Sequence, residues 1–140
     1  MPFHTPSLQA GGDIRPHRFN KYSTSADNTA LEADANEFVM GISTEATQDA
    51  PLPSADGDAA ESGDQVHYYP TGTECLLEIG SGGVTRGAWI KSDADGKGVL
   101  AATTGATAQF YGAFALESAS EGEFARVLVW PLPKVYPALA

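Results

Sequence analysis

The residues of this sequence best suited to nucleophilic or acid–base chemistry are few. They are three histidines and one cysteine: His4, His17, His67 and Cys75. A nucleophile needs a base within hydrogen-bond reach, and histidine is the usual base. Cys75 lies in a run where apolar and acidic residues alternate, which points its side chain inward, where a thiol is inert. We therefore expect no catalytic pair and predict that the protein is not an enzyme.

Two further runs have the composition of ligand-binding loops but not their spacing. Asp93-Ala94-Asp95-Gly96 resembles the start of a calcium loop, but Thr104 stands where an EF-hand requires its bidentate glutamate. An Asp-Gly pair is typical of a tight hairpin turn, because glycine accepts a positive φ. The run Gly80-Ser81-Gly82-Gly83 has neither the lysine nor the spacing of a phosphate-binding loop. The sequence thus predicts no metal and no cofactor.

The composition excludes several classes of protein. The chain has 140 residues, a formal net charge of −10 and a single cysteine. Such a charge leaves no basic field for nucleic acid, and one cysteine cannot form an intramolecular disulfide. No apolar run approaches the ~20 residues that span a bilayer, so we expect a soluble protein without a membrane segment. The 15 glycines and 9 prolines favour many short strands over a helical bundle.

The clearest strand pattern lies between Phe110 and Trp130. An alternating run comes first, a polar turn follows at 117–122, and a second β-rich run covers 123–130. Both faces of this segment are largely apolar, which indicates a β-hairpin buried on two sides. We interpret it as core.

Parts of this pattern occur earlier in the chain. Ile14…Phe19-Asn20-Lys21 parallels Val84…Trp89-Ile90-Lys91, and the turn Asp27-Asn28 parallels Asp95-Gly96. Three single residues of the first half, Leu31, Phe38 and Gly41, correspond to Leu100, Phe110 and Gly112. Such self-similarity indicates a tandem duplication. The pseudo-repeats would cover about 14–79 and 84–130, with an acidic loop, 46–60, inserted in the first.

Residues 25–40 have two interpretations. Thr29 followed by Glu32 resembles a capping box, and the apolar residues nearby have helical spacing. The alternative is a β-hairpin that runs into a strand over 38–44. The duplication favours the hairpin, because the matching stretch of the second half alternates like a strand.

We therefore predict an all-β fold, a small β-barrel or β-sandwich made from two pseudo-repeats. Residues 26–130 would form a single β domain, with an extended arm over 1–25 before it and an extended proline-rich tail over 131–140 after it. The arm combines basic and apolar residues, so we expect it to become ordered on a partner. The expected contact residues are Phe3, Ile14, Arg15, Arg18, Phe19, Lys21 and Tyr22.

The order of these phrases resembles that of the small capsid decoration, or cement, proteins of tailed bacteriophages. The phrases are Gly41 to Ala46 with Gly63 to Tyr68, then Val84 to Gly96, and then Gly112 to Val129. The resemblance covers about 31–130. It implies a compact β-barrel or β-sandwich on the outside of an icosahedral head, which stabilises the shell, assembles as trimers and has no catalytic residues.

On this resemblance the expected partners are the major capsid protein and further copies of the chain, in a homotrimer or a dimer. The protein would be made in the host cytoplasm and reside on the outer surface of the virion. The alternative is a receptor- or glycan-binding β module on the virion surface. That module would use four aromatic residues, Tyr68, Tyr69, Trp89 and Tyr111. Exposed aromatic side chains would favour the binding module, and buried ones the structural role.

Overall fold

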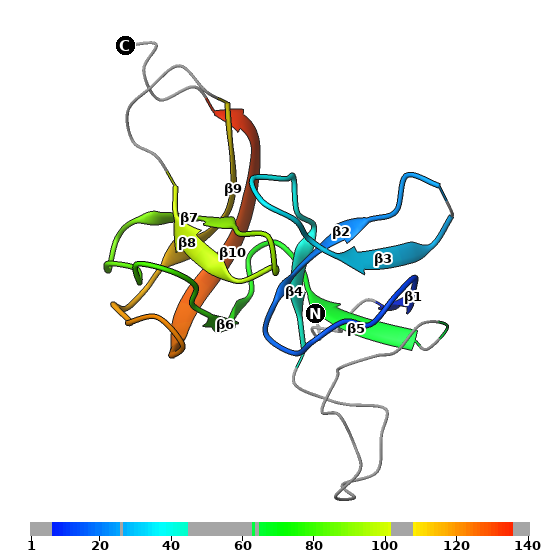
Figure 1. Cartoon of the computed structure of the whole chain (residues 1–140), viewed down its shortest axis with the longest axis horizontal. Helices are drawn as coiled ribbons and strands as arrows, with labels where there is room; N and C mark the ends of the chain where they lie inside the picture. Colours follow the sequence, from blue (N-terminus) through cyan, green and yellow to red (C-terminus); the bar gives the residue numbers. More distant parts are fainter. Residues whose placement is uncertain (1–6, 26, 45–62, 64, 102–107, 136–140) are drawn as a thin grey trace, which may run out of the picture.

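The computed structural model describes residues 7–25, 27–44, 63, 65–101 and 108–135. Within these residues the chain forms strands and no helix, so the predicted all-β fold is confirmed (Figure 1). The predicted acidic loop, 46–60, lies outside the described residues. The strands are β1 (Ser7–Ala10), β2 (Phe19–Tyr22), β3 (Thr29–Glu32), β4 (Gly41–Ser43), β5 (Gln65–Tyr69), β6 (Glu74–Glu78), β7 (Trp89–Ser92), β8 (Gly98–Leu100), β9 (Gln109–Ala115) and β10 (Phe124–Val135).

The first five strands close into a barrel, which we call the first unit. Its strand order is β1-β3-β2-β4-β5. β1 closes the barrel because it pairs in parallel with β3 (Gln9 opposite Thr29) and antiparallel with β5 (Leu8 opposite Val66). Closure leaves no free sheet edge in this unit. The helical interpretation of 25–40 is wrong, since β3 pairs along its length with β2.

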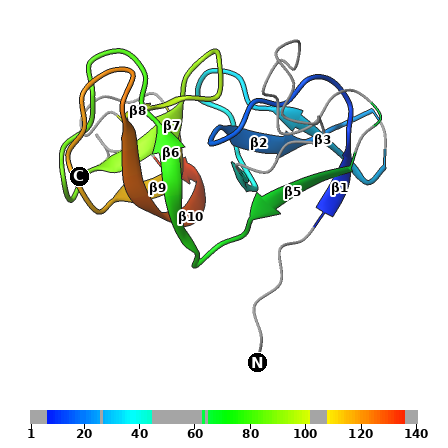
Figure 2. The same ribbon diagram turned by 90° about the horizontal axis from the view of Figure 1, so that it is seen from below.

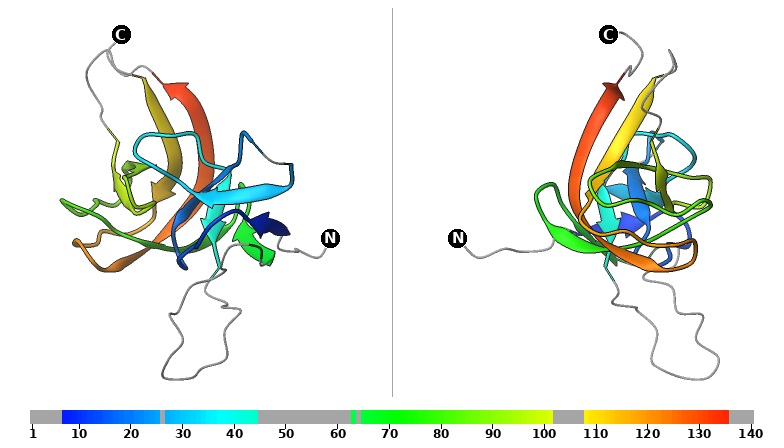
Figure 3. Two further views of the ribbon diagram at one scale, coloured as in Figure 1. Left: turned by 45° about the vertical axis from the view of Figure 1, so that its right-hand side comes forward. Right: turned by 90° about the vertical axis from the view of Figure 1, so that its left-hand side faces the viewer.

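The last five strands form a second sheet, which we call the second unit, with the order β6-β10-β9-β7-β8. The two outer strands of this order, β6 and β8, approach each other at one parallel bridge between Ile79, which follows β6, and Gly98 of β8. The two units lie side by side in Figures 1 and 2. β9 and β10 form a long ribbon that extends beyond the other strands (Figure 3).

The two units share one topology. Beginning at β3, the first unit has the order β3-β2-β4-β5-β1, and the second has β8-β7-β9-β10-β6. The registers correspond as well: Phe19 is opposite Ile42 in the first unit, and Trp89 is opposite Phe114 in the second. From these registers Phe19 matches Trp89 and Phe38 matches Phe110, as the sequence comparison proposed.

Two of the residue matches proposed from sequence are shifted by one position. Lys21 pairs with Leu31 and Lys91 with Val99, so Leu31 matches Val99 and not Leu100. Gly41 likewise matches Ala113 and not Gly112, because Asn20 pairs with Gly41 and Ile90 with Ala113. A one-residue slip would move every side chain to the opposite face, and the observed strand pairs show which register the strands adopt.

The Asp-Gly turn expected at 93–96 is present. The Asp93 carboxylate oxygen Oδ1 accepts hydrogen bonds from the backbone N–H groups of Asp95 (2.8 Å) and Lys97 (2.9 Å). Gly96 has a φ of 79°, and Asn28 of the first unit has a φ of 53°. Both values lie in the left-handed region, which glycine and asparagine tolerate best.

Residues 7–25 are not an arm, because they contain two strands of the barrel. β2 lies inside the sheet between β3 and β4, and Ile14 and Phe19 are 0% exposed. Pro16 falls in the turn before β2, so it costs no ladder hydrogen bond. β1 was missed because its partner β5 lies far away along the chain. Of the predicted tail, 131–135 belongs to β10, and 136–140 lies outside the described residues.

The apolar core has two parts. One fills the barrel of the first unit and includes Ile14, Val66 and Tyr68. The other is shared, because Phe19, Val39 and other residues of the first unit belong to one cluster with the interior of the second. A Cβ added at Gly112 would lie 2.7 Å from both the Phe19 ring and Val39 Cγ2. The first unit therefore packs directly on β9, and the two units are held together by one core.

Adding a methyl group at the packed glycine should destabilise the fold. Gly112→Ala would place its Cβ against two fully buried side chains and should cost about 1–3 kcal/mol of unfolding free energy. Urea titration would measure it. The matched control is Gly12→Ala, where an added Cβ meets nothing within 4 Å. Equal effects of the two substitutions would contradict the packing of the units.

Candidate functional site

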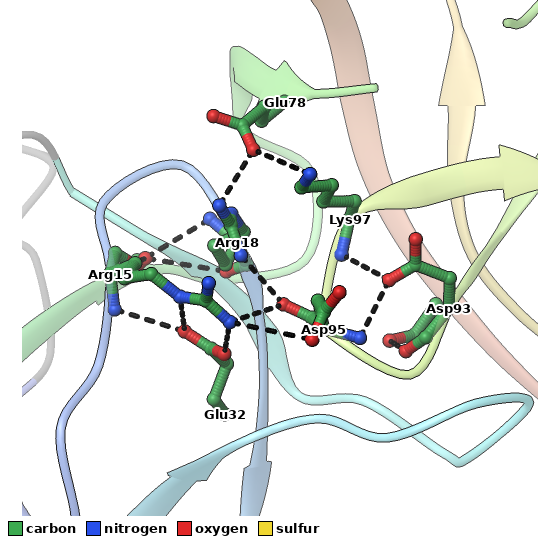
Figure 4. A network of polar contacts seen from close by, with 9 residues as sticks. Arg15, Arg18, Glu32, Glu78, Asp93, Asp95 and Lys97 are labelled. Atoms are coloured by element: carbon green, nitrogen blue, oxygen red, sulfur yellow. Dashed lines mark hydrogen bonds and ion pairs between the residues drawn. The ribbon is translucent and has the colours of Figure 1, made fainter. Parts of the chain in front are cut away.

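A cluster of charged side chains lies where the two units meet. Figure 4 shows the side chains from the first unit beside those from β6 and the 93–97 turn of the second. The cluster comprises Arg15, Arg18, Glu32, Glu78, Asp95 and Lys97.

Arg18 is the most buried member of the cluster, and only 6% of its surface is exposed. Its Nη2 lies 2.7 Å from Glu78 Oε2, and its Nη1 donates a 2.9 Å hydrogen bond to the carbonyl oxygen of Asp95. Lys97 Nζ is 3.6 Å from the same Glu78 oxygen. A buried guanidinium is tolerated only where its charge is paired, so this arrangement holds Arg18 to the second unit.

Arg15 is held by Glu32 from the same unit. Its backbone N–H donates to Glu32 Oε2 at 3.0 Å, and its Nε donates to the same oxygen at 3.2 Å. The hydrogen bond to Glu32 raises the pKa of Arg15, and Asp95, whose Oδ1 is 3.8 Å away, acts in the same direction. Both guanidinium groups are therefore ion-paired with carboxylates of their own chain, which weakens their attraction for the acidic groups of a partner.

Backbone groups extend this junction. The N–H of Phe19 donates to the carbonyl oxygen of Gly96 at 2.8 Å, and the N–H of Glu78 donates to the carbonyl oxygen of His17 at 2.9 Å. The Asn36 side chain also forms two hydrogen bonds with the backbone at the start of β9. Its Nδ2 donates to Ala108 O at 2.9 Å, and its Oδ1 accepts from the N–H of Phe110 at 3.2 Å. The charged cluster is thus part of a structural junction.

An open pocket of about 550 Å³ has Asn36 in its lining together with Met40, which belongs to the core of the first unit, so the pocket lies at the mouth of the barrel. We call it the mouth pocket. Two of its lining side chains are large, apolar and exposed: Tyr22 (54%) and Phe38 (46%). Leu31, Met40 and Phe110 add further apolar surface. Exposed apolar groups gathered in a hollow are typical of a binding surface.

Lys21 supplies the charge at the rim of the mouth pocket. Its Nζ is 2.8 Å from Glu37 Oε1 and 3.2 Å from Asp34 Oδ2. These hydrogen bonds, chiefly the one to Glu37, raise the pKa of Lys21. The ammonium group is therefore charged and already paired within the chain.

The structure places the seven predicted contact residues in different surroundings. Phe3 lies outside the described residues, and Ile14 and Phe19 are fully buried. Arg15, Arg18 and Lys21 form ion pairs within the chain. Tyr22 lines the mouth pocket with an exposed ring. A contact role for these residues stays a prediction. Phe38, which was not among the predicted contact residues, lines the same pocket as Tyr22, and the sequence had marked it only as part of the pattern over 25–44 and as the match of Phe110.

The structure describes the surroundings of two of the residues considered for catalysis, His17 and Cys75. His17 Nδ1 lies 3.3 Å from the carbonyl oxygen of Leu76, and its ring contacts Phe124 edge-on at 5.1 Å. Burial raises the pKa of Cys75 to about 12. The described residues contain no group of three His, Cys, Asp or Glu side chains that could hold a metal, and no helix long and apolar enough to cross a membrane.

The four aromatic residues of the alternative hypothesis do not form an exposed platform. Tyr68 and Tyr111 are each 7% exposed, and Tyr69 and Trp89 are half-buried. Trp89 stacks on Tyr111 with 5.2 Å between ring centres. The Tyr68 hydroxyl lies 3.3 Å from that of Tyr22, and burial is the main cause that raises the pKa of Tyr68 to about 12. Packing of this kind favours a structural role.

The fold described so far is similar to that of a known structure. No family model and no curated protein matches the chain. Among solved structures it is similar to the crystal structure of the N base of head fiber gp8.5 from bacteriophage phi29. The TM-score is 0.61 at 19% sequence identity, with 94% of this chain and 97% of the other covered. The chain therefore has the fold of that protein over almost its whole length.

Removing the buried guanidinium should weaken the junction. Arg18→Met leaves Glu78 without its closest cation and should cost about 3 kcal/mol in a denaturant titration. Arg18→Met with Glu78→Leu should recover most of this loss. The control is Lys21→Met, whose partners are more exposed and which should cost less than about 1 kcal/mol. An Arg18→Met protein as stable as the wild type would contradict the assignment.

The raised pKa of Cys75 predicts a slow thiol. A pKa of about 12 keeps the thiol protonated at neutral and mildly alkaline pH, and only the thiolate attacks alkylating reagents. Iodoacetamide at pH 8 should therefore modify the folded protein about a thousandfold more slowly than the urea-denatured protein. Mass spectrometry at timed intervals measures both rates. Rapid modification of the folded chain would show an accessible thiolate.

Proposed function

We propose that this protein is a structural component of a bacteriophage virion, which binds the outside of an assembled icosahedral head and stabilises the shell. The observation that carries the proposal is the shared fold with the base of a phage head fiber, over nearly the full length of both chains. On this proposal the chain is made in the host cytoplasm, and its partner is the major capsid protein.

The charge distribution supports such a role. The chain has a formal net charge of −10, and the arginines and the lysine of its N-terminal region pair with carboxylates of the same chain. Its exposed large apolar side chains, which include Leu76 and Trp130, are therefore the natural contacts for a protein partner.

Stabilisation would follow from mass action. A protein that binds only the assembled shell stabilises that state by RT ln(1 + [L]/Kd) at each site. A symmetric shell repeats the site many times, so a modest affinity per copy adds up over the particle. The role requires a rigid body with a defined contact surface, which the shared core of the two units supplies.

Binding to heads tests the proposal directly. The purified chain should co-sediment in a sucrose gradient with assembled heads that lack it, and not with unassembled major capsid protein. Heads carrying the chain should also release their DNA at a higher temperature than bare heads. A chain that stays at the top of the gradient would contradict the proposal.

The N-terminal contact is tested by a shorter deletion than the sequence suggested. Removal of 1–25 would delete β1 and β2, whereas removal of 1–6 leaves all strands of the described residues in place. Deletion of 1–6, or Phe3→Ala, should weaken head binding at least tenfold and leave the thermal transition unchanged. Full occupancy of heads by both variants would show that the contact lies elsewhere on the chain.

A further inference from the structure

The contact between the two units uses one particular face of the first unit. Phe19 and Val39 on this face pack on Gly112, the N–H of Phe19 binds Gly96 O, and the N–H of Asn36 donates to Ser92 O at 2.9 Å. Gly112, Gly96 and Ser92 lie at one end of the second unit, next to the β7–β8 turn. We call this end the mouth of the second unit, and the first unit covers it.

The second unit has an equivalent of the covering face. From the strand registers Phe19 matches Trp89, Ile42 matches Phe114, and Glu32 matches Leu100. Phe19 and Ile42 are 0% exposed because the second unit covers them, whereas Leu100 is 44% exposed and Trp89 and Phe114 are half-buried. This second-unit face (Trp89, Leu100, Phe114) is thus apolar and partly exposed, whereas Phe19 and Ile42 at the equivalent positions are fully buried.

The first unit in turn has an equivalent of the covered mouth. The registers match Tyr22 with Ser92 and Met40 with Gly112, and Phe38 corresponds to Phe110. These first-unit residues line the mouth pocket. In the second unit the same positions bind the first unit, through Ser92 O, Gly112 and the N–H of Phe110. The mouth pocket therefore lies where the other unit has its interface.

We propose that copies of this chain associate head to tail, with the second-unit face of one copy covering the mouth pocket of the next. The contact inside the chain shows what kind of surface fits such a mouth: the outer face of a neighbouring unit of the same topology. Within one copy the first unit's face is already used. The second unit's face in another copy is the matching surface that is left.

The chemistry of the two surfaces fits this pairing. The mouth pocket exposes Tyr22 and Phe38, and the opposing face offers Trp89 and Leu100. Met40 takes the place of Gly112 and would meet the incoming aromatic ring. A methionine side chain adapts to such a contact because it is long and unbranched. The interface is heterologous, so repetition gives a closed ring or an open filament.

Two single substitutions test the two surfaces by light scattering on the purified full-length chain over a range of concentrations. The wild type should form an oligomer, and Phe38→Asp or Leu100→Asp should raise its dissociation constant about 30-fold or more, because each places a carboxylate in an apolar contact. Phe124→Asp is the matched control, since its ring is 47% exposed and lies on neither surface. It should associate like the wild type.

Mixing the two variants distinguishes head-to-tail association from a symmetric contact. The Leu100→Asp chain keeps an intact mouth pocket, and the Phe38→Asp chain keeps an intact second-unit face. An equimolar mixture should therefore form one-to-one dimers that grow no further, whereas each variant alone stays monomeric. Thermal transitions within a few degrees of the wild type would confirm that all variants fold.

Three results would overturn the proposal: a monomeric wild type, equal dissociation by Phe124→Asp, or no dimer in the mixture. The measurement contains no heads, so its failure leaves shell binding untouched. Conversely, a chain that oligomerises as described but does not sediment with heads would refute the proposed function alone.

Discussion

The rest of the molecule depends on the close packing of Phe19 and Val39 against Gly112. At this point the Phe19 and Val39 side chains of the first unit pack directly on the backbone of the second, because Gly112 has no side chain, and the two units share a core cluster. The hydrophobic gain needs a glycine at this place, because any Cβ would overlap the ring. The two units thereby share one core and are not two independent modules.

The charged groups around this contact have a local role. Burial of the Arg18 guanidinium would be unfavourable alone, but Glu78 and the Asp95 carbonyl compensate it. These groups orient the two units, and the direction of the Arg18 contact is more specific than apolar packing could be. The same pairing removes basic charge from the surface, so partners meet an acidic protein with isolated apolar patches.

A duplicated fold also explains why the surfaces of the two units differ. Phe19 is equivalent to Trp89, and Met40 is equivalent to Gly112. The residues differ because their surroundings differ: Gly112, for example, leaves room for the Phe19 ring. Phe19 is enclosed by the neighbouring unit, while Trp89 keeps part of its ring in solvent and stacks on Tyr111. The mouth pocket at Tyr22 stays open, although Phe110 of the second unit lines part of it.

The amino-acid sequence by itself determined the fold class, because alternating apolar residues and Gly, Asn and Asp turns specify short strands. It also revealed the duplication and the match of Phe19 with Trp89, since local patterns survive at fixed spacing. Only the tertiary structure decided that Ile14 and Phe19 are core residues, and that Arg15 and Arg18 are paired within the chain. The physical reason is that burial and ion pairing arise from contacts between β2, β6 and the 93–97 turn. These segments are far apart in sequence, and no local pattern records which of them will meet.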